Sequence, residues 1–265
     1  MAANAFFGYL LLAGGPPVVL FCAFVARKSF LVLLTLASAF IWLVSLLIIA
    51  ALFRGFVPLS PSAGPFAALL VVAVLIQECV RYGVWRLHGV TVQSLEAAAH
   101  DMVGTRLTAT DKMSMALTYG LAHGGTHSVF LYLSWLPAAL GDGTLYTDAC
   151  PHMSYFLAGA LLSLAFFLLH TFSMVVVFDG YRTGKKERRF GPPVLHMLAA
   201  LLTLASFARN GCLAAVPILL AVGVAMTAWA GQGRGKSEAL EEGQERIAPG
   251  RRKVVRQKLR APGQG

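Results

Sequence analysis

The chain has 265 residues, of which 57% are hydrophobic and 13% charged, and its mean hydropathy is +0.68. Soluble domains carry about a quarter charged residues, so this composition excludes an ordinary soluble domain and indicates an integral membrane protein. The net charge of +10 does not indicate nucleic-acid binding, because most Lys and Arg residues lie in loops and one tail between apolar segments.

Seven apolar segments of membrane-spanning length follow one another along the chain. An α-helix rises about 1.5 Å per residue and the hydrocarbon core is roughly 30 Å thick, so about 20 residues are needed. The expected spans are residues 5–26, 31–53, 66–87, 113–136, 155–178, 191–208 and 212–230. The sequence therefore predicts an all-α, polytopic membrane protein with seven transmembrane helices.

The distribution of Lys and Arg gives the expected orientation, because positively charged loops stay in the cytosol. Of the 22 basic residues, 19 lie on one side: between the first and second spans, between the end of the third span and the start of the fourth, between the fifth and sixth spans, and in the tail. Arg54 and Arg209 lie on the other side. The N-terminus is therefore expected to be lumenal or extracellular, and the C-terminus cytosolic.

Two regions are predicted: a seven-helix transmembrane domain, 1–230, and a basic tail, 231–265, whose composition is typical of disorder. The four cysteines lack the spacing of a metal site, and we expect no metal and no cofactor. Cys150 and Cys212 are both expected near the lumenal face. A disulfide between them and two free thiols are both open interpretations.

Glu78 and Arg81 are ionisable residues within the third span, three positions apart and therefore neighbours on a helix. One interpretation is a local pair near the cytosolic end, from which Arg81 extends toward the interface. The other is a polar contact with a different helix. In either case they form a candidate intramembrane polar pair.

The fourth span carries small residues at every fourth position, namely Ala116, Gly120, Gly124 and Ser128. This spacing places them on one helix face, where another backbone can approach closely. Gly- and Ala-rich spans also produce such patterns by chance. His123 and His127 lie next to this ridge, and the sequence assigns them no role.

His170 in the fifth span and His196 in the sixth are two ionisable rings in hydrocarbon. The two spans run in opposite directions, so both rings are expected roughly 10 Å from the cytosolic ends of their helices. A single core histidine is usually hydrogen-bonded and structural. Two at matching depth on consecutive helices favour a shared polar cavity.

No catalytic motif is present in the spans: HExxH is missing, and so is a Gly-x-Ser-Gly nucleophile. A membrane aspartyl protease needs two carboxylates at one depth. Asp142 is expected in a lumenal loop and Asp179 at the cytosolic end of the fifth span, so they cannot meet. We expect no catalytic residue on this chain.

Several segments carry a resemblance to one family, in its order and spacing, over roughly residues 5–230. They are Phe6-Phe7-Gly8 with Gly15-Pro16, Ile41-Trp42-Leu43-Val44-Ser45-Leu46-Leu47, Gln77-Glu78-x-x-Arg81, Gly120-x-x-x-Gly124, Ser154-Tyr155-Phe156-Leu157, Leu168-Leu169-His170-Thr171-Phe172 with Phe178-Asp179, His196 and Pro217. Together they resemble the anterior-pharynx-defective (Aph) subunit of gamma-secretase. Ser128 departs from the pattern, because the family usually continues its glycine ridge there.

The resemblance implies a non-catalytic scaffold that assembles with presenilin, nicastrin and the presenilin enhancer subunit in the lipid bilayer. It would support presenilin maturation for the cleavage of type I membrane proteins, with the active aspartates on presenilin. It also implies that Gly120 and Gly124 support assembly, and that His170 and His196 line a cavity near presenilin's C-terminal end. The expected locations are the endoplasmic reticulum, Golgi, plasma and endosomal membranes.

The alternatives are a seven-span receptor and a transporter-like protein. Glu78, Arg81 and Tyr82 faintly resemble the acidic-Arg-Tyr motif of such receptors, but the seventh span has Pro217 without Asn-Pro-x-x-Tyr. A transporter is disfavoured because the chain shows no half-chain repeat.

Overall fold

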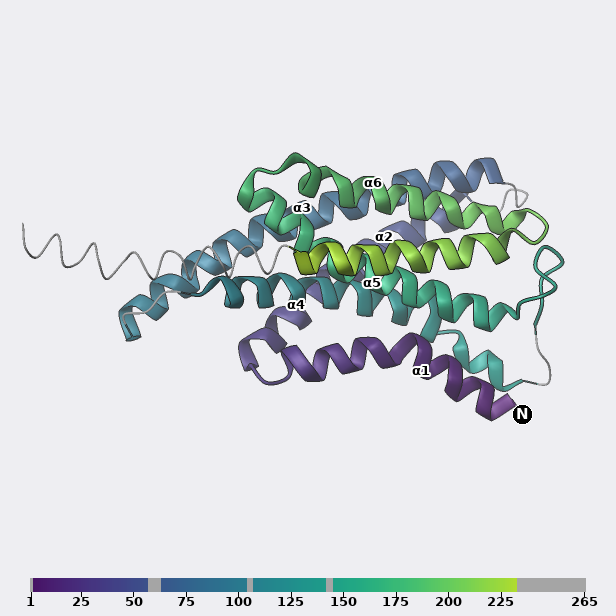
Figure 1. Ribbon diagram of the computed structural model, residues 1–265, viewed down its shortest axis with the longest axis horizontal. Coiled ribbons are helices and arrows are strands. Elements are labelled where there is room, and N and C mark those ends of the chain that lie inside the picture. The colour runs from purple at the N-terminus through teal and green to yellow at the C-terminus, as the bar shows by residue number, and fades with distance from the viewer. Residues whose placement is uncertain (1, 57–62, 104–106, 142–144, 233–265) are drawn as a thin grey trace, which may run out of the picture.

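The computed structural model describes residues 2–56, 63–103, 107–141 and 145–232. Its long helices are α1 (Ala2–Leu20), α2 (Ser29–Phe56), α3 (Ala63–Val103), α4 (Ala109–Ser128), α5 (Tyr155–Thr183), α6 (Lys186–Leu202) and a last helix, Gly211–Gln232. Shorter turns are η1 (Phe21–Val25), η2 (Val129–Leu133), η3 (Leu136–Leu140) and η4 (Thr203–Phe207). Successive long helices run in alternating directions along the bundle (Figure 1). The predicted tail, 231–265, lies outside the described residues from 233 onward.

Six helical segments of the described chain are long and apolar enough to cross a membrane. They are Ala3–Val25, Ser29–Gly55, Ala63–Ala98, Tyr155–Thr183, Lys186–Phe207 and Gly211–Gln232. The all-α class and multi-pass character predicted from the sequence are therefore confirmed. The expected fourth span, 113–136, is helical in most of its length but does not reach the same hydropathy.

The position of α4 explains its lower hydropathy. Its most extensive contacts are with α5 and α2, and most of its residues from Met115 to Gly124 are buried. A helix surrounded by protein meets small and polar neighbours instead of lipid, so it can carry Thr, Tyr, Gly and His. Hydropathy therefore identifies lipid-facing helices more readily than it identifies a central helix such as α4.

Helix α3 is longer than its predicted span. The predicted third span ends at residue 87, whereas the helix continues without interruption to Val103. The added turns contain good helix formers such as Leu95 and Glu96, and Lys112 of α4 lies 2.6 Å from the Glu96 carboxylate. This extension projects beyond the bundle at the end opposite the N-terminus (Figure 1).

A capping box starts α4 at the same end of the bundle. Thr108 Oγ1 accepts a hydrogen bond from the Asp111 amide at 3.1 Å, and the Thr108 amide donates to Asp111 Oδ2 at 3.3 Å. Lys28 lies 3.1 Å from Asp111 Oδ1 and so connects the turn before α2 to α4. Burial raises the pKa of Asp111, but the hydrogen bonds from Thr108 and Lys28 outweigh it and hold this pKa below its usual range.

The segment before α5 is fastened to the start of the last helix. Cys150 and Cys212 form a disulfide, so of the two open interpretations the structure shows the bonded one. The Asn210 amide donates to the Ala149 carbonyl oxygen at 2.6 Å, and Ser154 caps α5. These contacts hold the connecting loop against the bundle at the end that carries the N-terminus (Figure 1).

Candidate assembly site in the helical bundle

The small-residue ridge of α4 faces α5 of the same chain. A Cβ atom added to Gly124 would lie 2.6 Å from Thr171 Oγ1 and 2.7 Å from the Phe167 carbonyl oxygen. One added to Gly120 would come still closer to the Thr171 carbonyl oxygen. Ser128 continues the ridge and is 1% exposed. The two glycines therefore let the backbones of α4 and α5 approach closely within the subunit.

Glu78 and Arg81 form an ion pair on α3, and both also contact other helices. The His196 ring donates from Nδ1 to Glu78 Oε1 at 2.7 Å, and Arg81 Nη2 lies 3.5 Å from His170 Nδ1. Arg81 is only 1% exposed and does not extend toward the interface. The pair therefore links α3 to α5 and α6.

His170 and His196 lie together, although they belong to different helices. Their ring centroids are 4.7 Å apart in an edge-on arrangement, and both rings are buried. The depth argument from the sequence predicted two rings at one level, and the structure places them in contact. Because Glu78 holds the His196 ring and Arg81 lies beside His170, the two rings are part of one polar assembly.

His123 and His127, to which the sequence assigned no role, also point into this region. His127 and His170 have ring centroids 4.5 Å apart, and His123 stacks on Trp42 of α2 with centroids 4.2 Å apart. Trp42 also meets His170 edge-on at 5.2 Å. The sequence gave Trp42 only as part of a family motif, because an aromatic residue in an apolar span has no distinctive pattern of its own.

Six side chains make up what we call the buried polar cluster. They are Glu78 and Arg81 on α3, His123 and His127 on α4, His170 on α5, and His196 on α6. With neutral rings, one carboxylate balances one guanidinium, as a buried site requires. Both ring nitrogens of His123, and one each of His127 and His170, have no hydrogen-bond partner within the described residues. The cluster thus retains capacity for a further polar group.

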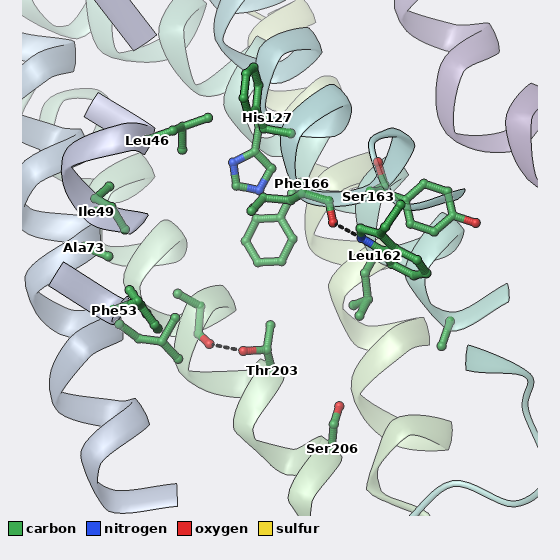
Figure 2. Close-up of a pocket in the computed structure, with 18 of the residues that line it drawn as sticks. Leu46, Ile49, Phe53, Ala73, His127, Leu162, Ser163, Phe166, Thr203 and Ser206 are labelled. Carbon is green, nitrogen blue, oxygen red and sulfur yellow. Dashed lines mark hydrogen bonds between the residues drawn. The ribbon is translucent and has the colours of Figure 1, made fainter. Parts of the chain in front are cut away.

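A cavity of about 830 Å³ adjoins the cluster, on its side toward the disulfide. Its wall is mostly apolar and is built by α2, α3, the end of α4, η2, α5, α6, η4, the start of the last helix, and the loop at 147–153 that carries Cys150, which we call the disulfide loop. Figure 2 shows Leu46, Ile49 and Phe53 on one side, Leu162 and Ser163 on the other.

Four polar side chains line the cavity where it meets the helices of the cluster: Gln77, His127, Ser163 and His196. His170 does not reach the wall but contacts His127 and His196, which do. The cavity is therefore an apolar chamber with a few polar groups, the usual composition of a site that receives a largely apolar ligand with one polar end.

These features define a class of protein: a polytopic helical membrane protein that turns its polar side chains inward, toward a common cluster and cavity. The family model of the Aph-1 protein matches residues 4–237 of the chain. The chain therefore belongs to the Aph-1 family, as its resemblance predicted.

Curated relatives from distant organisms agree with this assignment. The "Gamma-secretase subunit APH1-like" protein of Arabidopsis thaliana is 41% identical over 223 residues, which cover 84% of this chain and 89% of the relative. The "Gamma-secretase subunit Aph-1" of Drosophila melanogaster is 33% identical over 77% of this chain and 82% of its own length. The "Gamma-secretase subunit APH-1B" of Homo sapiens is 30% identical over 87% of this chain and 88% of its own length. The similarity thus extends over most of each protein.

Proposed function

We propose that this chain is a non-catalytic scaffold subunit of a gamma-secretase complex, in which it stabilises presenilin and supports its maturation. The observation that carries the proposal is the family match over residues 4–237, together with relatives that are named gamma-secretase subunits. The partners would be presenilin, nicastrin and the presenilin enhancer subunit, and the catalytic aspartates would belong to presenilin. Family membership sets aside the receptor and transporter alternatives.

The proposed topology has seven spans, with α4 and η2 as the fourth. Together they cover residues 109–133, roughly 37 Å of helix, which is long enough for a hydrocarbon core of roughly 30 Å. The alternating helix directions in Figure 1 support a crossing at this position. The distribution of Lys and Arg supports a lumenal N-terminus.

A glycosylation acceptor inserted between residues 137 and 154 tests the fourth crossing. In the seven-span topology this loop is lumenal and the acceptor receives a glycan, whereas an acceptor inserted after Lys185 does not. If α4 did not cross, the 137–154 acceptor would remain unmodified, and the proposed topology would be wrong.

The cavity is the proposed contact for presenilin's C-terminal end. An apolar segment of presenilin would fill the cavity and pack against its wall, and the polar terminus of that segment would reach the side chains of Gln77, His127 and His196. The unpartnered Nδ1 of His127, which lines the cavity, would then gain a hydrogen-bond partner. The role of the histidines is thus structural and polar, without acid–base catalysis.

Purification in a mild detergent after co-expression with the three partner subunits tests the scaffold role. The expected result is that presenilin and nicastrin are recovered with the chain, and that the chain alone cleaves no transmembrane substrate. Recovery of the chain without presenilin, although all partners are present in the same membranes, would contradict the proposal. Cleavage by the isolated chain would contradict its non-catalytic part.

A further inference from the structure

Three aromatic rings form a continuous surface where α3, α5 and the start of α6 meet. The Trp85 and Tyr181 rings stack with centroids 4.3 Å apart, and Tyr82 lies 5.5 Å from Trp85 and 5.8 Å from Tyr181. We call these three residues the aromatic rim. It lies at the end of the bundle opposite the N-terminus, and Tyr82 is 41% exposed. Tyr and Trp are the side chains enriched at the boundary between lipid and water.

Two exposed arginines lie at either end of the aromatic rim. The Arg189 guanidinium carbon is 4.8 Å from the centroid of the Tyr181 ring, and Arg86 Nη1 is 3.5 Å from the Tyr82 hydroxyl. Neither guanidinium forms an ion pair with a carboxylate of the described residues. Cation–π contact holds Arg189 in place while leaving its hydrogen-bond donors free.

The charge around the aromatic rim is positive. The nearby Asp179 is already paired with Arg182 and Arg188. Lys185, in the turn before α6, and Lys186 and Glu187, the first residues of α6, add two lysines and one exposed carboxylate. Arg86 and Arg189, beside the aromatic rim, are therefore available to bind an anion from outside the chain.

An exposed apolar stripe begins at the aromatic rim and continues along α6. Phe190, Val194 and Leu198 are 55%, 56% and 57% exposed and are spaced four residues apart, so they share one helix face. On α3, which is packed against α6, Leu75 and Cys79 extend from Tyr82 in the same way. The surface therefore joins a cationic, aromatic end to an apolar track directed into the membrane.

We propose that this surface binds an anionic phospholipid. Arg86 and Arg189 bind the phosphate, for which a planar guanidinium is well suited, and the acyl chains lie along the α6 stripe. A zwitterionic lipid would leave the positive charge uncompensated, and a soluble phosphate would leave the apolar track empty. The site stands apart from the presenilin contact. In the proposed orientation it faces the cytosolic leaflet, where anionic lipids are concentrated.

The test uses the full chain in nanodiscs of phosphatidylcholine alone or with added phosphatidylserine, and native mass spectrometry to measure retained lipid. The variant is Arg86→Gln with Arg189→Gln. Its matched control is Arg54→Gln with Arg209→Gln, which removes the same charge at the other end of the bundle. We expect roughly 25-fold weaker phosphatidylserine retention in the variant, about fivefold per arginine, and no change in the control.

Equal loss in both double variants, or equal retention of phosphatidylcholine and phosphatidylserine, would overturn the proposal. Displacement of the lipid by inorganic phosphate would also overturn it, since it would indicate a site for a free anion. Tyr181→Leu provides a variant without a charge change and should weaken phosphatidylserine retention several-fold, while Tyr181→Phe should not. In the assembled complex, loss of lipid retention by the unchanged chain, together with cross-linking of a partner subunit to the separate variant Arg189→Cys, would show that protein covers the rim and would overturn the proposal.

Discussion

His196 Nδ1 and Glu78 Oε1 lie 2.7 Å apart, although 118 residues separate them in the chain. The same carboxylate pairs with Arg81, so one oxygen on α3 meets a guanidinium on its own helix and an imidazole on α6. Buried ion pairs contribute little net stability when complete, but removing one partner is costly because the other is left unpaired. Glu78 is therefore the member of the buried polar cluster on which most contacts depend.

Replacing Glu78 by Ala should lower the stability of the bundle by about 3 kcal/mol, because Arg81 would remain 1% exposed without its carboxylate. The double replacement Glu78→Ala with Arg81→Met should cost less than Glu78→Ala alone. Thermal unfolding in detergent measures both. The control is Glu96→Ala, since the Glu96–Lys112 pair is partly exposed and is worth at most about 1 kcal/mol. A similar loss in the control would contradict this account of the pair.

Gly124 and Gly125 are adjacent but differ in their surroundings, which provides a matched test of the ridge. Gly124→Ala would force α4 away from Thr171 and Phe167 and should cost about 2 kcal/mol. A Cβ at Gly125 would meet no atom within 4 Å, so Gly125→Ala should be neutral or stabilising by up to about 1 kcal/mol. Thermal midpoints and the yield of assembled complex measure the difference. Equal behaviour of the two variants would exclude close packing at Gly124.

His196→Ala should reduce the recovery of presenilin several-fold without preventing membrane insertion, because it changes both the cavity wall and the Glu78 contact. Adding His170→Ala should reduce recovery further. His152→Ala is the control, since His152 is an exposed residue of the disulfide loop. Co-purification of presenilin from equal amounts of membrane-inserted chain gives the comparison. Undiminished recovery with the double variant would remove the histidines from the proposed contact.

The disulfide should be detected as a linked Cys150–Cys212 peptide by mass mapping under non-reducing conditions. Cys150→Ser should lower stability by about 3 kcal/mol and increase hydrogen exchange in the loop before α5. Cys22→Ser and Cys79→Ser are controls, since these two cysteines are unpaired and exposed. Finding Cys150 and Cys212 as free thiols in the intact protein would contradict the structure at this point.

Much of the fold follows directly from the sequence, because lipid imposes long apolar segments. The strongly apolar span predicted at 155–178 lies within α5, Tyr155–Thr183, and 31–53 lies within α2. The polar extension of α3 to Val103 was missed, because a helix that leaves the membrane loses the apolar signal while keeping its hydrogen bonds. For the expected fourth span, 113–136, hydropathy is a weaker guide, because α4 is packed centrally against α5 and α2 and hydropathy describes contact with lipid.

The site was predictable where its contacts are local and, for His170 and His196, where two residues lie at matching depth on consecutive helices. Spacing along one helix indicated that Glu78 and Arg81 are neighbours and that Gly120 and Gly124 share a face. The pairing of Glu78 with His196 depends on which helices are adjacent in space, and no local pattern in one sequence contains that information. His123, next to the ridge in the sequence, acquires its surroundings only when α2 brings Trp42 against it.

The wall of the cavity draws on residues from Leu46 to Cys212, that is, on every long helix of the described chain except α1. During synthesis, most of the helices enter the membrane before residue 212 emerges from the ribosome. The chamber therefore has no complete form on a nascent chain until residue 212 has emerged, and a guest can occupy it only after that point of translation. The position of Cys212 in the chain thus sets the earliest stage of synthesis at which the cavity can receive a guest.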